Sequence, residues 1–153
     1  MKTKTLFNTV AGEVQLAYSI GIPYADLKSV KSSRDAESIF RLIWEEPIEL
    51  YESFYILLLN KANRVLAYRR ISTGGVTGTV VDPKSIFQAA LLTNASALIL
   101  AHNHPSGNLN HSEADARITT KVKHAGELLD ISVLDHLIIN GDSYFSFADE
   151  GIL

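Results

Sequence analysis

The chain has 153 residues, of which 46% are hydrophobic and 20% are charged, and its formal net charge is −3. This length is sufficient for one domain with a substantial core and short for two. Because the chain contains no cysteine, disulfides, thiolate zinc sites and cysteine nucleophiles are excluded. The acidic balance disfavours binding to nucleic-acid phosphates, although the basic pair Arg69-Arg70 leaves a local patch open.

Nothing in the sequence indicates a membrane partner or export. Apolar runs such as "ALILA" at 97–101 are far shorter than the about 20 residues that a bilayer span requires. The N-terminus has two early lysines but lacks the sustained apolar region of a signal peptide. We therefore expect a cytoplasmic protein. No pattern predicts an oligomeric state.

The first part of the chain gives weak signals, and we interpret it as an N-terminal extension, 1–32, ahead of a single domain at 33–153. Within the extension, the segment "EVQLAYSI" at 13–20 is compatible with a strand that is closed off by Pro23.

An amphipathic helix is predicted at the start of the domain. Apolar residues recur at i, i+3, i+4, i+7 and i+8, with Ser32 or Ser33 as the N-cap and an end before Pro47. The residues of this stripe are Ala36, Ile39, Phe40, Ile43 and Trp44. The helix therefore has one face to bury against the rest of the domain.

The middle of the chain predicts a hairpin, a helix and a short buried strand. Residues 51–60 and 65–73 are rich in bulky and branched side chains, and they flank the turn "KANR". Asp82 at an N-cap position, followed by Pro83 at the first helical position, predicts the start of a helix. The run 97–101 predicts a strand that is buried on both faces.

The last third of the chain predicts one helix and two strands. The helix runs from about Ser112 to Leu129. Its expected inward stripe consists of Ile118, Val122, Ala125 and Leu129. Strands are predicted at 131–140 and 144–147, joined by an Asn-Gly-Asp turn. The order of elements predicts an α/β domain with a mixed sheet.

A candidate metal site lies where the 97–101 strand meets the following helix. Residues two apart in a strand share a face, so His102 and His104 point the same way. Asp115 extends the inward stripe of the helix toward its N-terminus. Two neutral histidines and a carboxylate, with water in the fourth position, form the ligand set of a catalytic zinc. Such a metal lowers the pKa of its water to roughly 7.

Other interpretations exist for each part of this pattern. Ser112-x-x-Asp115 alone is close to a helix capping box, and Ser112 is able both to cap and to line a site. His-x-His alone is a weak signal. The combination His-x-His-Pro, a six-residue gap and Ser-x-x-Asp favours a metal site. The letters "HNH" do not indicate a nuclease, because that motif is spread over a ββα unit, and Asn103 is expected to face away from the metal.

The stretch "HNHPSGNLNHSEAD" resembles the JAMM (MPN+) metalloprotease motif, and "AHNHPSG" with "VLDHLII" resembles its bacterial RadC branch. The similarity covers roughly 33–153. It implies a cytidine-deaminase-like fold of the JAB1/MPN type, a mixed β-sheet sandwiched by helices. Residues 1–32 are too short for the helix-hairpin-helix segment of full-length RadC proteins, so the resemblance is to a shorter form.

The resemblance also implies roles for individual residues. Zinc is held by His102, His104 and Asp115, Ser112 helps to stabilise the oxyanion, and a glutamate is the general base. Relatives outside the RadC branch cleave isopeptide bonds to ubiquitin-like proteins, whereas the RadC branch carries a DNA-repair label.

Glu52 is the candidate for the glutamate. It lies at the start of the first core strand and shares a face with Phe54. A carboxylate on an apolar face is costly to bury unless something pairs with it, and a metal-bound water would do so. The alternatives are that Glu52 is solvated at the strand end, or that Glu49 is the base. Many RadC-like sequences carry a further glutamate on the next strand, where this chain has Arg69-Arg70.

The remaining histidines are assigned other roles. His136 alternates with apolar residues on a predicted strand, which favours a partly buried, hydrogen-bonded residue that supports the site over a direct ligand. His111 and His124 have no surrounding constellation and are interpreted as structural.

Taken together, the sequence predicts a zinc-dependent metallohydrolase (Zn2+ cofactor) of the RadC/JAMM type, acting on a peptide or isopeptide bond in a peptide or protein substrate. The alternatives are a DNA-repair-associated protein, or a non-catalytic binding module that keeps the fold. The identity of the substrate is not predicted.

Overall fold

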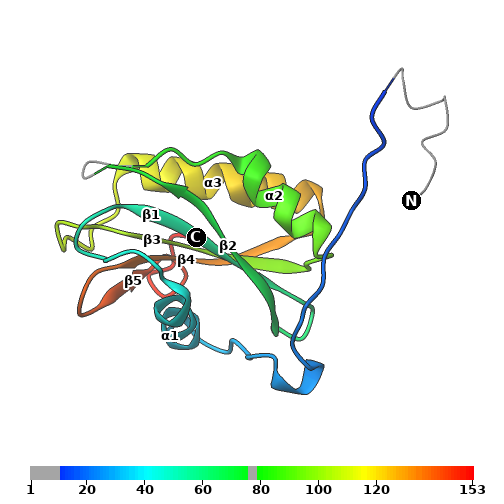
Figure 1. Cartoon of the computed structure of the whole chain (residues 1–153). Coiled ribbons are helices and arrows are strands. Elements are labelled where there is room, and N and C mark those ends of the chain that lie inside the picture. The colour runs from blue at the N-terminus through cyan, green and yellow to red at the C-terminus, as the bar shows by residue number, and fades with distance from the viewer. Residues whose placement is uncertain (1–10, 76–78) are drawn as a thin grey trace.

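The computed structural model describes residues 11–75 and 79–153 of the chain. They form a five-stranded sheet in the order β2-β1-β3-β4-β5, with helices on both faces (Figure 1). The elements are η2 (Tyr24–Asp26), α1 (Ser33–Ile43), β1 (Ser53–Leu59), β2 (Val65–Thr73), α2 (Pro83–Leu92), β3 (Ala97–Asn103), α3 (Glu113–Leu128), β4 (Ser132–Ile139) and β5 (Tyr144–Ser146). The predicted class, a mixed sheet sandwiched by helices, is confirmed.

The sheet contains both antiparallel and parallel strand pairs. β1 and β2 form an antiparallel hairpin, and β1 also pairs antiparallel with β3, with Phe54 opposite His102. β3 and β4 are parallel and are joined by α3, because a parallel pair needs a crossover. β5 closes the sheet antiparallel to β4. A loop, 104–112, leads from the C-terminal end of β3 to the start of α3.

The predicted helix starts are present. The Ser32 hydroxyl accepts a hydrogen bond from the Asp35 amide at the start of α1. The Asp82 carboxylate accepts one from Lys84, with Pro83 as the first residue of α2. These caps satisfy amide groups that have no partner within the helix.

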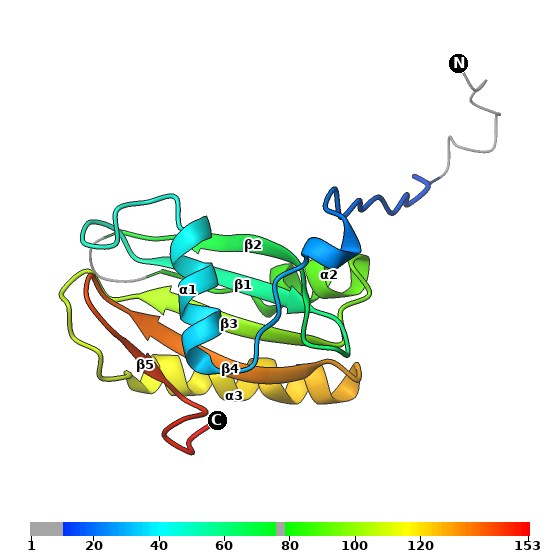
Figure 2. The same ribbon diagram turned by 90° about the horizontal axis from the view of Figure 1, so that it is seen from below.

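The sheet separates two hydrophobic clusters. Every residue of β1 and of β3 is buried, because both strands lie inside the sheet and are covered on both faces. One face packs against α2 and α3, and the other packs against α1 (Figures 1 and 2). The first cluster includes Phe54, Ile56, Leu98, Leu100 and Val122, and the second includes Phe40, Tyr55, Leu57, Ile99 and Leu137. Successive residues of one strand therefore belong to different clusters.

Two sequence-based expectations are wrong. Residues 13–20 form no strand, and Val14 and Leu16 are 83% and 79% exposed, because no other strand pairs with this segment among the described residues. Residues 1–10 of the predicted extension lie outside the described residues. The stripe of α3 ends early, since Leu129 follows the helix and is 42% exposed. Thr119 and Gly126 are buried instead.

Gly126 is required by a close approach of the chain. An added Cβ atom at this position would lie 2.3 Å from the Ile131 carbonyl oxygen. That carbonyl is backbone and cannot move aside easily, so a larger residue would push α3 away from the start of β4.

None of the helices in the described part of the chain is long and apolar enough to cross a bilayer.

Candidate metal centre

The end of β3 and the first turn of α3 bring three metal-ligating side chains together. His102 Nε2 lies 3.1 Å from Asp115 Oδ1, and His104 Nε2 lies 3.5 Å from Asp115 Oδ2. The two Nε2 atoms are 3.0 Å apart. One ligand atom from each residue falls within 4.8 Å of the others, a spacing suited to a single metal ion. Strand alternation turns both histidines to the α2/α3 face, where Asp115 meets them.

Asp115 is fixed by the capping box of α3. The Ser112 amide donates to Asp115 Oδ2 at 2.7 Å, and the Asp115 amide donates to Ser112 Oγ at 3.1 Å. Burial opposes ionisation of Asp115, but the neighbouring His102 and His104 outweigh it and hold the pKa of this carboxyl well below its usual range. The carboxylate is therefore charged before any metal arrives. Ser112 and Asp115 therefore cap the helix and line the candidate metal site at the same time.

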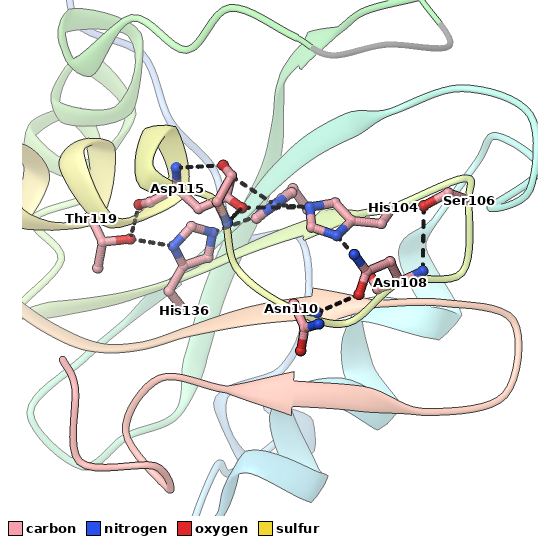
Figure 3. Close-up of polar contacts among 9 residues, drawn as sticks. His104, Ser106, Asn108, Asn110, Asp115, Thr119 and His136 are labelled. Atoms are coloured by element: carbon pink, nitrogen blue, oxygen red, sulfur yellow. Dashed lines mark hydrogen bonds and ion pairs between the residues drawn. The ribbon is translucent and has the colours of Figure 1, made fainter.

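His104 is held in an orientation that suits a ligand. Its Nδ1 lies 2.6 Å from the Asn108 carbonyl oxygen, which only accepts hydrogen bonds (Figure 3). In the neutral ring Nδ1 therefore carries the proton and Nε2 the lone pair. Two imidazole nitrogens and one carboxylate fit the ligand set of a catalytic zinc site, which leaves a fourth position open.

His136 supports the cluster from β4 without joining it. Its ring is fully buried, with Nε2 at 2.8 Å from His102 Nδ1 and Nδ1 at 2.6 Å from Thr119 Oγ1 (Figure 3). The predicted hydrogen-bonded role is confirmed, and the ring is buried more deeply than predicted. Thr119 was not identified in the sequence. Its position four residues after Asp115, on the same face of the helix, was the available signal.

A cavity of about 500 Å³ opens onto the three ligands. Its polar wall contains Glu52 and Ser112 besides the ligands, and its apolar wall is formed by Phe54, Val81 and Ile118. The five residues predicted for the site thus border one space. The individual catalytic roles of Glu52 and Ser112 remain predictions.

Glu52 immediately precedes β1 and is half-buried in this cavity. Burial raises the pKa of its carboxyl, and the charges of His102 and His104 partly offset that effect. Its peptide group is fixed from the β2 side, since the Gly74 amide donates to the Glu52 carbonyl at 2.8 Å. A carboxylate with a raised pKa, facing metal ligands, has the properties of a proton acceptor.

The other candidate residues lie elsewhere. Glu49 borders a second hollow, beside Gly141, whose lining shares only His104 with that of the metal cavity. Arg69 donates to the Ser85 carbonyl at 3.3 Å, and Arg70 pairs with Glu45 and Glu46. Neither arginine borders the metal cavity. The two arginines on β2 therefore contribute no side chain to the lining of the metal cavity.

Asn103 points to the face opposite the two histidines, as expected. Its Oδ1 accepts from the Ser53 amide at 2.8 Å, and its Nδ2 donates to the carbonyls of Tyr51 and Ile48, each at 2.7 Å. The pairing of β1 with β3 ends at Phe54 and His102. Beyond this pair, the Asn103 side-chain amide supplies the hydrogen bonds that a further pair of strand residues would make. It fixes the peptide groups on both sides of Glu52.

The last two histidines lie outside the cluster. His111 packs against Phe145 and Phe147, with ring centroids at 5.7 and 5.3 Å. His124 is exposed on α3. Neither belongs to the group of potential metal ligands found in the described part of the chain.

A mixed sheet between helices, with a His-His-Asp cluster where β3 meets α3, is the arrangement expected of a JAB-type domain. A family model described as a RadC-like JAB domain matches residues 30–152, and the chain belongs to this family. This confirms the resemblance to the RadC branch.

Curated relatives support the same assignment. The chain is 50% identical over 127 residues to a UPF0758 protein of Flavobacterium johnsoniae, covering 82% of this chain and 54% of that protein. It is 41% identical over 134 residues to one from Porphyromonas gingivalis, covering 86% and 59%. It is 44% identical over 102 residues to UPF0758 protein YfjY of Escherichia coli, covering 67% and 64%. The chain spans about half the length of the Flavobacterium relative, at 54%.

Proposed function

We propose that the chain is a zinc-dependent hydrolase that cleaves a peptide or isopeptide bond in a peptide or protein substrate. The observation that carries this proposal is the composition of one cavity. It contains three convergent metal ligands, a separate carboxylate with a raised pKa, and a hydroxyl group. Amide hydrolysis needs a polarised carbonyl, a base for water and a donor for the oxyanion, and these groups meet all three needs.

The zinc would be held by His102 Nε2, His104 Nε2 and the Asp115 carboxylate. When bound, zinc supplies a Lewis acid that lowers the pKa of a water to roughly 7 and polarises the substrate carbonyl.

Glu52 accepts a proton from the attacking water and delivers it to the leaving nitrogen. Burial raises the pKa of the Glu52 carboxyl toward neutral pH. A carboxylate of this kind accepts a proton more readily than an exposed glutamate and can still release it. The anchored peptide groups on both sides of Glu52 limit the movement of its side chain within the cavity.

Ser112 donates a hydrogen bond to the oxyanion. Its Oγ already accepts from the Asp115 amide, so its hydrogen is not used by the helix cap and is free to point into the cavity.

The test uses a library of fluorogenic peptide amides and acyl-lysine isopeptides, with zinc-loaded protein. Glu52→Gln should keep its zinc and lose roughly 100- to 10,000-fold in turnover, because the ligands are intact and the base is gone. Glu49→Gln is the matched control, since this glutamate borders a different hollow, and it should retain full activity. Loss of turnover in Glu49→Gln with retention in Glu52→Gln would show that the base is misassigned. Absence of turnover in the zinc-loaded wild type across the library would count against amide hydrolysis.

A further inference from the structure

A chain of hydrogen bonds connects the backbone of Asp115 to the ring of His102. The Thr119 hydroxyl lies 2.6 Å from the Asp115 carbonyl oxygen and 2.6 Å from His136 Nδ1. His136 Nε2 in turn lies 2.8 Å from His102 Nδ1. Figure 3 shows Asp115, Thr119 and His136 converging in this order between α3 and β4. The chain thus begins and ends on metal ligands.

The direction of each bond follows from the number of protons available. A carbonyl oxygen only accepts, so the single hydrogen of the Thr119 hydroxyl points to Asp115. Thr119 Oγ1 must then accept from His136 Nδ1–H. A neutral imidazole has one N–H, so His136 Nε2 accepts, and the proton between the two rings belongs to His102 Nδ1. The remaining nitrogen, His102 Nε2, carries a lone pair.

The environment of His136 keeps its ring neutral, as this scheme requires. The side chain is fully buried between β4 and α3, stacked on Phe147 at a centroid distance of 4.9 Å. Removing a charged imidazolium from water is costly, so the full burial of this side chain favours the neutral ring.

We propose that Thr119 and His136 are positioning residues, which lock His102 in the tautomer whose Nε2 lone pair faces the other two ligands. The inference rests on the proposed zinc site. His104 is set independently by the Asn108 carbonyl, so both Nε2 atoms present lone pairs 3.0 Å apart, beside the Asp115 carboxylate. A cation placed between these three electron-rich atoms would be attracted by all of them.

The arrangement couples two ligands through one helix turn. Asp115 supplies a carboxylate to the cluster and, through its backbone carbonyl, the acceptor on which the tautomer of His102 depends. Thr119 follows four residues later, so the same turn of α3 places both groups. Outer hydrogen-bond partners of this kind typically change metal affinity by about 10- to 100-fold when removed.

The first measurement is the tautomer of His102 by nitrogen-15 NMR in the metal-free protein, at a pH well above the ordinary histidine pKa. The expected result is a proton on Nδ1 in the wild type and a mixture of tautomers in Thr119→Val, which keeps the shape of the side chain and removes the hydroxyl. Thr119→Ser should restore the wild-type spectrum. Thr120→Val is the control, because Thr120 is the exposed neighbour on the same helix.

The second measurement is zinc affinity by competition with a chelator. Thr119→Val should bind zinc roughly 10- to 100-fold more weakly, while Thr119→Ser and Thr120→Val should match the wild type. A proton on His102 Nε2 in the metal-free wild type would overturn the inference, even if Thr119→Val did not fold. So would a folded Thr119→Val with unchanged tautomer and affinity. A wild type that binds no zinc would instead overturn the proposed function, since the tautomer is measured without metal.

Discussion

The two faces of β3 show how one strand serves both chemistry and scaffold. On the α2/α3 face, the hydrophobic cluster gives way at the strand end to His102, His104 and the cavity. On the α1 face, the corresponding end is closed by Asn103, whose side chain is fully buried and bonded to the segment before β1. Figure 2 shows α1 lying across its face of the sheet, with α3 on the opposite face.

The contrast between the two faces explains why two histidines flank an asparagine at 102–104. The histidines need an accessible face, on which His104 remains 16% exposed at the side chain. The asparagine is fully buried on the other face, where its side-chain amide bonds one backbone amide and two backbone carbonyls. Changes on the two faces should therefore separate function from stability.

Ser112 and Ser32 provide the sharpest contrast, because both cap a helix but only Ser112 borders the cavity. Each change to alanine should lower the free energy of unfolding by about 0.5–2 kcal/mol through loss of the cap. Ser112→Ala should in addition lower turnover of the peptide-amide library by about 100- to 1,000-fold, or about 2.7–4 kcal/mol. Urea unfolding and steady-state kinetics measure the two effects. Equal turnover in the two variants would remove Ser112 from the proposed mechanism.

Asn103 tests the scaffold face. Asn103→Ala leaves the Ser53 amide and two backbone carbonyls without their partner, so the free energy of unfolding should fall by about 2–3 kcal/mol. Zinc affinity should stay at the wild-type value, since the three ligands are untouched. The matched control is Asn110→Ala, at an exposed position, which should change neither quantity. A large loss of zinc affinity in Asn103→Ala would show that the two faces are not separable.

Regular periodicity is what made much of this fold predictable. α1 was predicted from its apolar repeat and the serine cap, and it occupies Ser33–Ile43 with Ser32 as the N-cap. The convergence of His102, His104 and Asp115 followed from a period of two in the strand and the inward stripe of the helix. Both signals lie within single elements.

The features that escaped prediction depend on contacts between elements. Thr119 is an ordinary polar helix residue in the sequence, and only its meeting with His136 of β4 gives it a role. The segment 13–20 alternates like a strand, but alternation alone does not supply a partner. α3 ends one residue before Leu129, and Asp130 then adopts a left-handed conformation with φ of 54°, which turns the chain toward β4.

The central claim is that His102, His104 and Asp115 form a zinc site. The most direct measurement is the metal content of protein purified without chelator, by elemental analysis. The account predicts about one zinc per chain in the wild type. Asp115→Ala should contain none, and Glu113→Ala, which removes an exposed carboxylate two residues away, should keep the full amount. A well-folded wild-type protein that contains no zinc and takes up none when it is added would contradict the account.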